Sequence, residues 1–151
     1  MGCLGAAPIW RPHLPLRRRI DHDAVGCESR EHVKVVLDDN AHGVFQAKVI
    51  VRPGAQQTDG RQMAQGLLLA DDAEFDAKPE LEIYADDVKC NHGATFGSLD
   101  EDQIFYLRAR GIPEDEARAL LIRAFLAEMF DHIEHDELRG MLTARVAARL
   151  A

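Results

Sequence analysis

Residues 44–51, Val44-Phe45-Gln46-Ala47-Lys48-Val49-Ile50-Val51, form a short apolar segment with strand character that ends in the turn residues Arg52-Pro53-Gly54. Four more segments of this kind surround it, and each is closed by a cluster of turn residues. They are Val33–Leu37, Gly66–Leu69, Leu81–Tyr84 and Val88–Phe96. The sequence therefore predicts a body of short strands.

The spacing of these segments limits the architecture. Their centres at Val35, Ile50, Leu68 and Ile83 are separated by 15, 18 and 15 residues. Such a loose recurrence is typical of the rungs of a β-solenoid. An antiparallel β-sandwich has similar strands and turns, so the spacing alone leaves both architectures open.

After Gly97 the apolar period becomes helical. Ser98 followed by Glu101 predicts a capping box, and Gly111 suits the end of that first helix. Pro113 fits the first turn of a second helix, whose apolar stripe is Ala117, Leu120, Leu121, Ala124 and Phe125. A third helix is predicted over Asp136–Leu150, with an apolar face of Leu138, Met141, Leu142, Val146 and Leu150.

The first 30 residues differ from the rest of the chain. They carry five Arg against three acidic residues, a net charge of +2. Because the whole chain has a net charge of −8, residues 31–151 carry −10. Three prolines between positions 8 and 15 interrupt any strand or helix period. We therefore expect a disordered or aberrant leader over 1–28, a β core over 29–97 and a helical domain over 98–151.

Composition excludes several classes of protein. The 151 residues are 46% hydrophobic, enough for a core, but contain no apolar run near the roughly 20 residues that cross a bilayer. The acidic balance disfavours a nucleic-acid binder, whose affinity rests on basic side chains. Three widely spaced cysteines, Cys3, Cys27 and Cys90, do not form a disulfide framework. A reducing cytoplasm is the simplest location.

The densest chemistry lies in residues 86–95. Alternation along a strand places Cys90 and His92 on the same face, where a thiolate and a neutral imidazole are ligands for iron or zinc. The alternative is that Cys90 is a small buried hydrophobe and His92 a hydrogen-bonded strand histidine. Because a closed metal centre takes four ligands, a site built on these two residues needs a partner chain and would lie at an interface.

Other candidate sites are weaker. His132 and His135 could share a helix face and hold a metal, although a solvated helix end explains the acidic residues around them better. Asp86 could join Cys90 and His92 in a small metal-dependent enzyme, but the Asp86-Asp87 and Asp71-Asp72 pairs are more typical of turns. No catalytic motif emerges.

A series of motifs, in order and without gaps, carries a family resemblance. They include Val51-Arg52-Pro53-Gly54-Ala55-Gln56, Lys78-Pro79-Glu80-Leu81-Glu82-Ile83, Ala85-Asp86-Asp87-Val88-Lys89-Cys90 and His92-Gly93-Ala94-Thr95. Over about Glu28 to Met129 the chain resembles the C-terminal core of the SufB/SufD family of iron–sulfur cluster assembly proteins. The His-Gly-Ala-Thr motif is similar to the SufD branch of this family.

The resemblance implies a right-handed parallel β-helix, here truncated, followed by a small helical domain. It also implies a non-catalytic scaffold subunit that works with SufB and the ATPase SufC. His92 would ligate the nascent iron–sulfur cluster at the interface with SufB, with Cys90 beside it, and this chain alone would hold no cofactor. The helical domain would dock SufC, and Leu120, Leu121 and Phe125 are the partner-binding residues that we expect there.

Family members run to several hundred residues, so we expect this chain to be a C-terminal portion with a foreign leader. A cut solenoid presents an uncovered sheet edge, which favours pairing with another chain or with a second copy of this one. Two other functions stay open: a purely structural solenoid adaptor, and the small metal-dependent enzyme. We expect no nucleic-acid or membrane partner.

Overall fold

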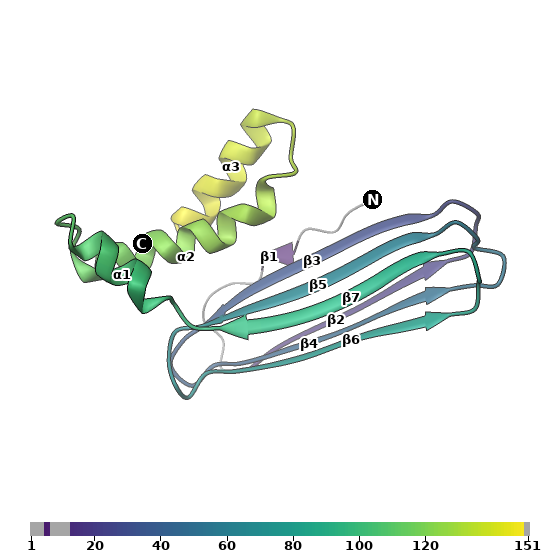
Figure 1. Cartoon of the computed structure of the whole chain (residues 1–151), viewed down its shortest axis with the longest axis horizontal. Coiled ribbons are helices and arrows are strands. Elements are labelled where there is room, and N and C mark those ends of the chain that lie inside the picture. The colour runs from purple at the N-terminus through teal and green to yellow at the C-terminus, as the bar shows by residue number, and fades with distance from the viewer. Residues whose placement is uncertain (1–4, 7–12, 150–151) are drawn as a thin grey trace.

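The computed structural model describes residues 5–6 and 13–149, which form two parallel β-sheets followed by helices (Figure 1). The first sheet has the strand order β1 (Gly5–Ala6), β3 (Glu28–Leu37), β5 (Asp59–Leu68) and β7 (Lys89–Gly97). The second has the order β2 (His13–His22), β4 (His42–Val51) and β6 (Glu74–Ile83). Successive strands therefore alternate between the two sheets.

Every strand pair in the described residues is parallel, so the antiparallel sandwich is wrong. Glu28 pairs with Asp59 and Asp59 with Lys89, so each sheet repeats about every 30 residues. The strands of the two sheets run in opposite directions (Figure 1). The spacing of 15 to 18 residues seen in the sequence is therefore half of one repeat.

All five predicted apolar segments overlap strands, but β3, β5 and β6 begin five to seven residues earlier than predicted. β5 begins at Asp59 and β6 at Glu74, well before their apolar ends. Their first halves alternate polar outward residues with small or buried inward residues, as in Gln62, Ala64 and Ala77. This alternation suffices for a strand that is covered on one face only.

The prediction of a disordered leader over 1–28 is wrong for residues 13–22. They form β2, which pairs with β4 along its whole length. Pro15 is tolerated because β2 is the outermost described strand of its sheet, so one side of its backbone makes no ladder bonds. Asp21 accepts two hydrogen bonds from Arg52, at 2.6 and 2.8 Å. Residues 1–4 and 7–12 of the predicted leader lie outside the described residues.

The core lies between the sheets. Inward side chains of both sheets pack into two clusters, one around Val33, Val35, Leu37, Phe45, Ala47 and Ala64, and one around Val49, Val51, Ala55 and Ala85. Gly66 is needed in this core because a Cβ there would lie 2.6 Å from the ring of Phe75. The interior is thus closely packed with apolar groups over most of its length.

The helices begin after β7. They are α1 (Glu101–Arg108), α2 (Glu114–Ala127), the 3₁₀ turn η1 (Glu128–Phe130) and α3 (Asp136–Ala147). Gly111 adopts a φ of 87°, as a helix-ending residue does, and Pro113 directly precedes α2. Within the described part of the chain, no helix is long and apolar enough to cross a bilayer.

Two helical predictions need correction. The N-cap of α1 is Asp100, which accepts from the backbone amides of Asp102 and Gln103, so the capping box at Ser98 and Glu101 is wrong. An aspartate caps as well as a serine does and lies nearer the helix. The predicted apolar face of α3 is only partly covered: Leu138 is 46% and Met141 71% exposed, Leu142 and Val146 are half-buried, and Leu150 lies outside the described residues.

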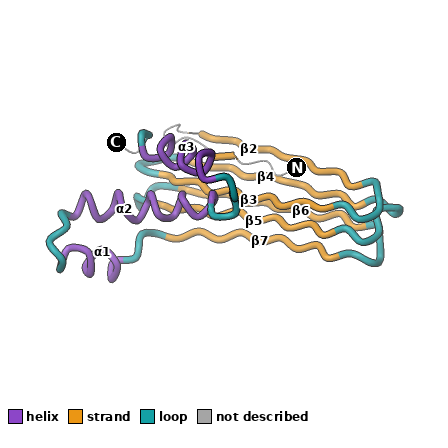
Figure 2. The backbone as a smooth tube through the Cα atoms, turned by 90° about the horizontal axis from the view of Figure 1, so that it is seen from above, coloured by secondary structure: helices purple, strands orange, loops and turns teal. Residues whose placement is uncertain are grey.

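The helical segment packs on the outer face of the β3–β5–β7 sheet, near one end (Figures 1 and 2). The contact cluster joins Val36 and Leu67 of the sheet to Leu99, Ile104, Ile122 and Leu126. Lys34 of β3 is fully buried beneath it and donates to the carbonyl oxygen of Phe125 at 2.8 Å. Its ammonium group also pairs with Glu128 and lies 4.3 Å from the centre of the Phe125 ring. This lysine ties the helices to the sheet.

Candidate functional site

Cys90 and His92 lie on β7, the outermost described strand of its sheet. Cys90 pairs in register with Gly60 and His92 with Gln62, both of which are buried inward positions of β5. The predicted common face is therefore the inward one. The two residues differ in their surroundings, because Cys90 is half-buried and His92 is exposed.

Cys90 packs against the apolar cluster formed by Val49, Val51, Ala55 and Ala85. The Cys90 Sγ and the Ser29 Oγ both lie close to Gly60 of β5. A Cβ at position 60 would be 3.3 Å from the Cys90 Sγ and 3.4 Å from the Ser29 Oγ. This packing suits a small hydrophobic residue, although Cys90 itself lies on the outermost described strand. The role of Cys90 as a ligand stays a prediction.

A buried histidine lies at the same end of the interior. His22 is 5% exposed, and its Nε2 lies 3.0 Å from the Ser29 Oγ in a hydrogen bond. Burial lowers the pKa of His22 below the usual 6.5, against a smaller opposing effect of Asp21. The imidazole is therefore neutral at physiological pH.

His92 stands at the open end of a polar row inside the protein. Glu31, Gln62 and His92 occupy equivalent positions on β3, β5 and β7. Gln62 Nε2 donates to Glu31 Oε2 at 2.7 Å, and Arg18 Nε lies 3.6 Å from Glu31 Oε1. Glu31 is 5% and Gln62 1% exposed. The row thus joins an ion pair, a buried amide and an exposed imidazole.

Sequence reasoning missed Glu31 and Gln62. Neither residue belongs to a motif, and successive members of the row, from Glu31 to Gln62 and from Gln62 to His92, are about one repeat of 30 residues apart. That separation was the available signal. A register of one full repeat places positions 31, 62 and 92 side by side.

The described residues assemble no three His, Cys, Asp or Glu side chains close enough to hold a metal ion. Asp86 therefore does not join Cys90 and His92 in a three-ligand centre, as the small metal-dependent enzyme would require. His132 and His135 share no helix, because His135 is the N-cap of α3 and its Nδ1 accepts from Leu138 N at 3.3 Å.

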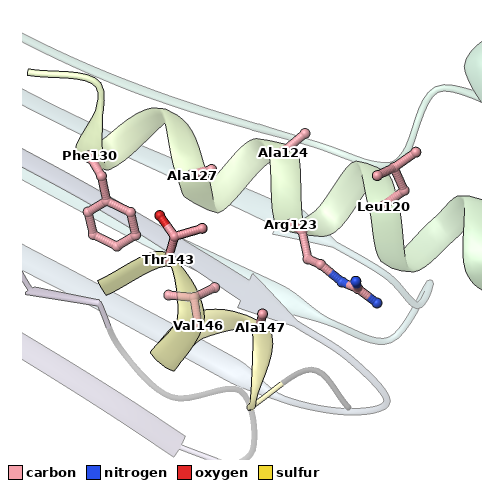
Figure 3. Close-up of a pocket in the computed structure, with 8 residues that line it drawn as sticks. All are labelled: Leu120, Arg123, Ala124, Ala127, Phe130, Thr143, Val146 and Ala147. Carbon is pink, nitrogen blue, oxygen red and sulfur yellow. The ribbon is translucent and has the colours of Figure 1, made fainter. Parts of the chain in front are cut away.

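The residues predicted to bind a partner divide into two groups. Leu121 and Phe125 are partly buried against the cluster that joins α2 to the sheet. Leu120 is 46% exposed and lines a groove of about 180 Å³ between α2 and α3 (Figure 3). The rest of its lining is Arg123, Ala124, Ala127, Phe130, Thr143, Val146 and Ala147. The groove is almost wholly apolar.

Residues 11–125 match the family model described as the SufBD core domain of the SUF system for FeS cluster assembly. The chain belongs to the SufB/SufD family. The match includes β2, so the expectation of a foreign segment over 1–28 is wrong from residue 11 onward.

Several family members are similar over most of the chain. It is 41% identical over 145 residues, 96% of its length, to the iron–sulfur cluster assembly protein SufD of Escherichia coli. It is 45% identical over 116 residues, 77% of its length, to a SufBD family protein of Synechocystis. A SufBD family protein of Mycobacterium tuberculosis is 36% identical over 91% of the chain. These alignments cover 34%, 26% and 37% of the respective relatives, so the chain spans about a third of their length.

Proposed function

We propose that this chain is a SufD-like scaffold subunit of a cytoplasmic complex that assembles iron–sulfur clusters with SufB-type and SufC-type partners. Its family membership and its similarity to a protein named SufD support the proposal. In this proposal the two alternating parallel sheets are coils of a right-handed β-helix. The chain itself turns over no substrate, and the SufC-type subunit supplies ATP hydrolysis.

The exposure of His92 carries the proposal. Inward residues at equivalent positions of the neighbouring strands, Glu31 and Gln62, are buried, whereas His92 lies on an uncovered strand. An imidazole that faces a polar interior row and is still open to another chain suits a site shared between subunits. We infer that His92 ligates the nascent cluster at the SufB-type interface and that Cys90 supplies a second donor.

The α2–α3 groove supports a docking role for the helices. Leu120 is exposed on an apolar groove of the kind that receives a partner's side chains. Leu121 and Phe125 hold α2 on the sheet and so keep this groove in place. We propose that the SufC-type ATPase binds here.

The test uses the complete complex of this chain with the SufB-type and SufC-type subunits of the same organism. His92→Ala should abolish most cluster formation, which is measured by the visible absorbance of the cluster. Gel filtration should show that the complex stays intact. Asn91→Ala changes the adjacent exposed residue and should leave cluster formation unchanged. Normal cluster formation in a His92→Ala/Cys90→Ala double variant would instead favour the purely structural adaptor.

Docking is tested separately. Leu120→Glu should weaken binding of the SufC-type subunit, measured by calorimetry, because it places a charge in an apolar groove. Met141→Glu alters a more exposed apolar residue that does not line this groove, and should bind normally. Equal losses in both variants would contradict docking at the groove.

A further inference from the structure

Gln62 has a buried oxygen without a hydrogen-bond partner. The residue is 1% exposed, and its Oε1 finds no donor among the described residues, although its Nε2 is bonded to Glu31. Burying a polar atom without a partner is destabilising, so folded proteins rarely leave one in this state. The oxygen is therefore a candidate acceptor for a group that is not yet in place.

The direction of this oxygen is fixed by Glu31. Gln62 Nε2 donates to Glu31 Oε2 at 2.7 Å, which turns the NH₂ group of the amide towards Glu31 and its oxygen away. Arg18 holds the carboxylate from the other side at 3.6 Å. The amide of Gln62 consequently cannot exchange its two ends without losing the bond to Glu31.

His92 is the next residue in this row. It pairs in register with Gln62 and shares its inward face. The facing sheet contributes the row of Arg18, Ala47 and Pro79, in which Ala47 and Pro79 have no polar side-chain atoms. Arg18 is paired with Glu31, so among the remaining side chains of these two rows the His92 ring is the natural donor for the free oxygen of Gln62.

We propose that Gln62 is a positioning residue that accepts a hydrogen bond from one ring N–H of His92. The bond fixes the imidazole tautomer and leaves the other ring nitrogen deprotonated and free to bind iron. Metal-bound histidines characteristically donate their second N–H in this way, which orients the ring and raises its basicity. The proposal rests on the proposed function of His92, and it requires only a rotation of that exposed side chain.

The direct test is the tautomer of His92 in the full-length chain, measured by ¹⁵N NMR of the imidazole nitrogens at about pH 8, above the ordinary pKa of an imidazole. We expect one dominant tautomer in the wild type and a mixture in Gln62→Met, which has a similar volume and no acceptor. The same mixture in both proteins would overturn the proposal.

Gln65→Leu is the matched control. Gln65 lies on the same strand and its Oε1 is 2.8 Å from the Nε2 of His32 in a hydrogen bond. This variant should change the tautomer of His32 and leave that of His92 unaltered. If Gln62→Met does not fold, the wild type alone decides, because a mixture of His92 tautomers in it contradicts the proposal.

In the complete complex, Gln62→Met should slow cluster formation about tenfold, the effect typical of removing the hydrogen-bond partner of a metal-bound histidine. Failure of the proposed function has a different signature. Cluster formation would then survive His92→Ala, whatever the tautomer shows. A fixed tautomer in both the wild type and Gln62→Met overturns the positioning role while leaving His92 as a ligand.

Discussion

The inward faces of β4 and β7 follow the same alternation, yet one is a core and the other a surface. Phe45, Val49 and Val51 of β4 are at most 1% exposed, whereas Phe96 of β7 is 70% exposed. The difference does not come from residue type, since both strands carry a phenylalanine inward. It comes from position, because β4 lies between two strands and β7 is the outermost described strand of its sheet. A stacked interior becomes available for chemistry only where no strand covers it.

The largest expected effect is in the covered region. Phe45→Ala removes a ring from the centre of the inner cluster and should lower the free energy of unfolding by about 3–5 kcal/mol, from lost burial and the cavity left behind. Urea denaturation measures it. A change below about 1 kcal/mol would mean that the two sheets are not packed against each other.

A smaller effect is expected where the helices meet the sheet. Lys34→Met leaves the Phe125 carbonyl without its donor and should cost about 1–3 kcal/mol. Hydrogen exchange should show lost protection in α2 and η1 but not in β4. Lys78→Met is the control, because Lys78 is 68% exposed and its pair with Glu80 lies at the surface, where an ion pair contributes at most about 1 kcal/mol. Loss of protection spread evenly over both sheets would contradict a local tie.

The buried His22 makes the free energy of unfolding depend on pH. Its pKa is lowered on folding, so the unfolded chain binds more protons once the pH falls below about 6.5. Stability is therefore complete above that pH and declines as the pH drops towards the folded-state pKa. His22→Gln should flatten the decline between pH 7 and 5 in urea titrations, and exposed His132→Gln should not. An unchanged slope in His22→Gln would show that other groups cause the decline.

The smallest effect is expected at the uncovered strand. Phe96→Ala should change the free energy of unfolding by no more than about 0.5 kcal/mol, because the ring is largely in solvent already. Thermal unfolding of this chain alone measures it. A loss comparable to that of Phe45→Ala would show that the inward face of β7 is covered in solution, for example by a second copy.

The sequence predicted the strands whose residues are apolar on both faces and missed those that are only half apolar. Val44–Val51 was visible because it is a nearly continuous apolar run, while the first halves of β5 and β6 alternate small and polar residues. β2 escapes prediction because Pro15 interrupts the strand pattern of the sequence, although an outermost strand accepts proline. Local composition does not reveal whether a strand lies at an edge.

The candidate site was predictable in part for a similar reason. Cys90 and His92 are two residues apart, so alternation alone places them on one face. Glu31 and Gln62 are neighbours of His92 only through the parallel register, which depends on the lengths of the intervening turns. Turn lengths cannot be converted into register until the sheets are known.

The repeat of about 30 residues also governs how a chain of this kind can change length. Deleting one residue within a strand turns every later side chain of that strand inside out, so the polar row and the apolar clusters exchange places with the surface. Deleting or duplicating a whole repeat preserves the stacking of each inner row. We therefore expect related chains to differ in the length of their β region by whole repeats of about 30 residues.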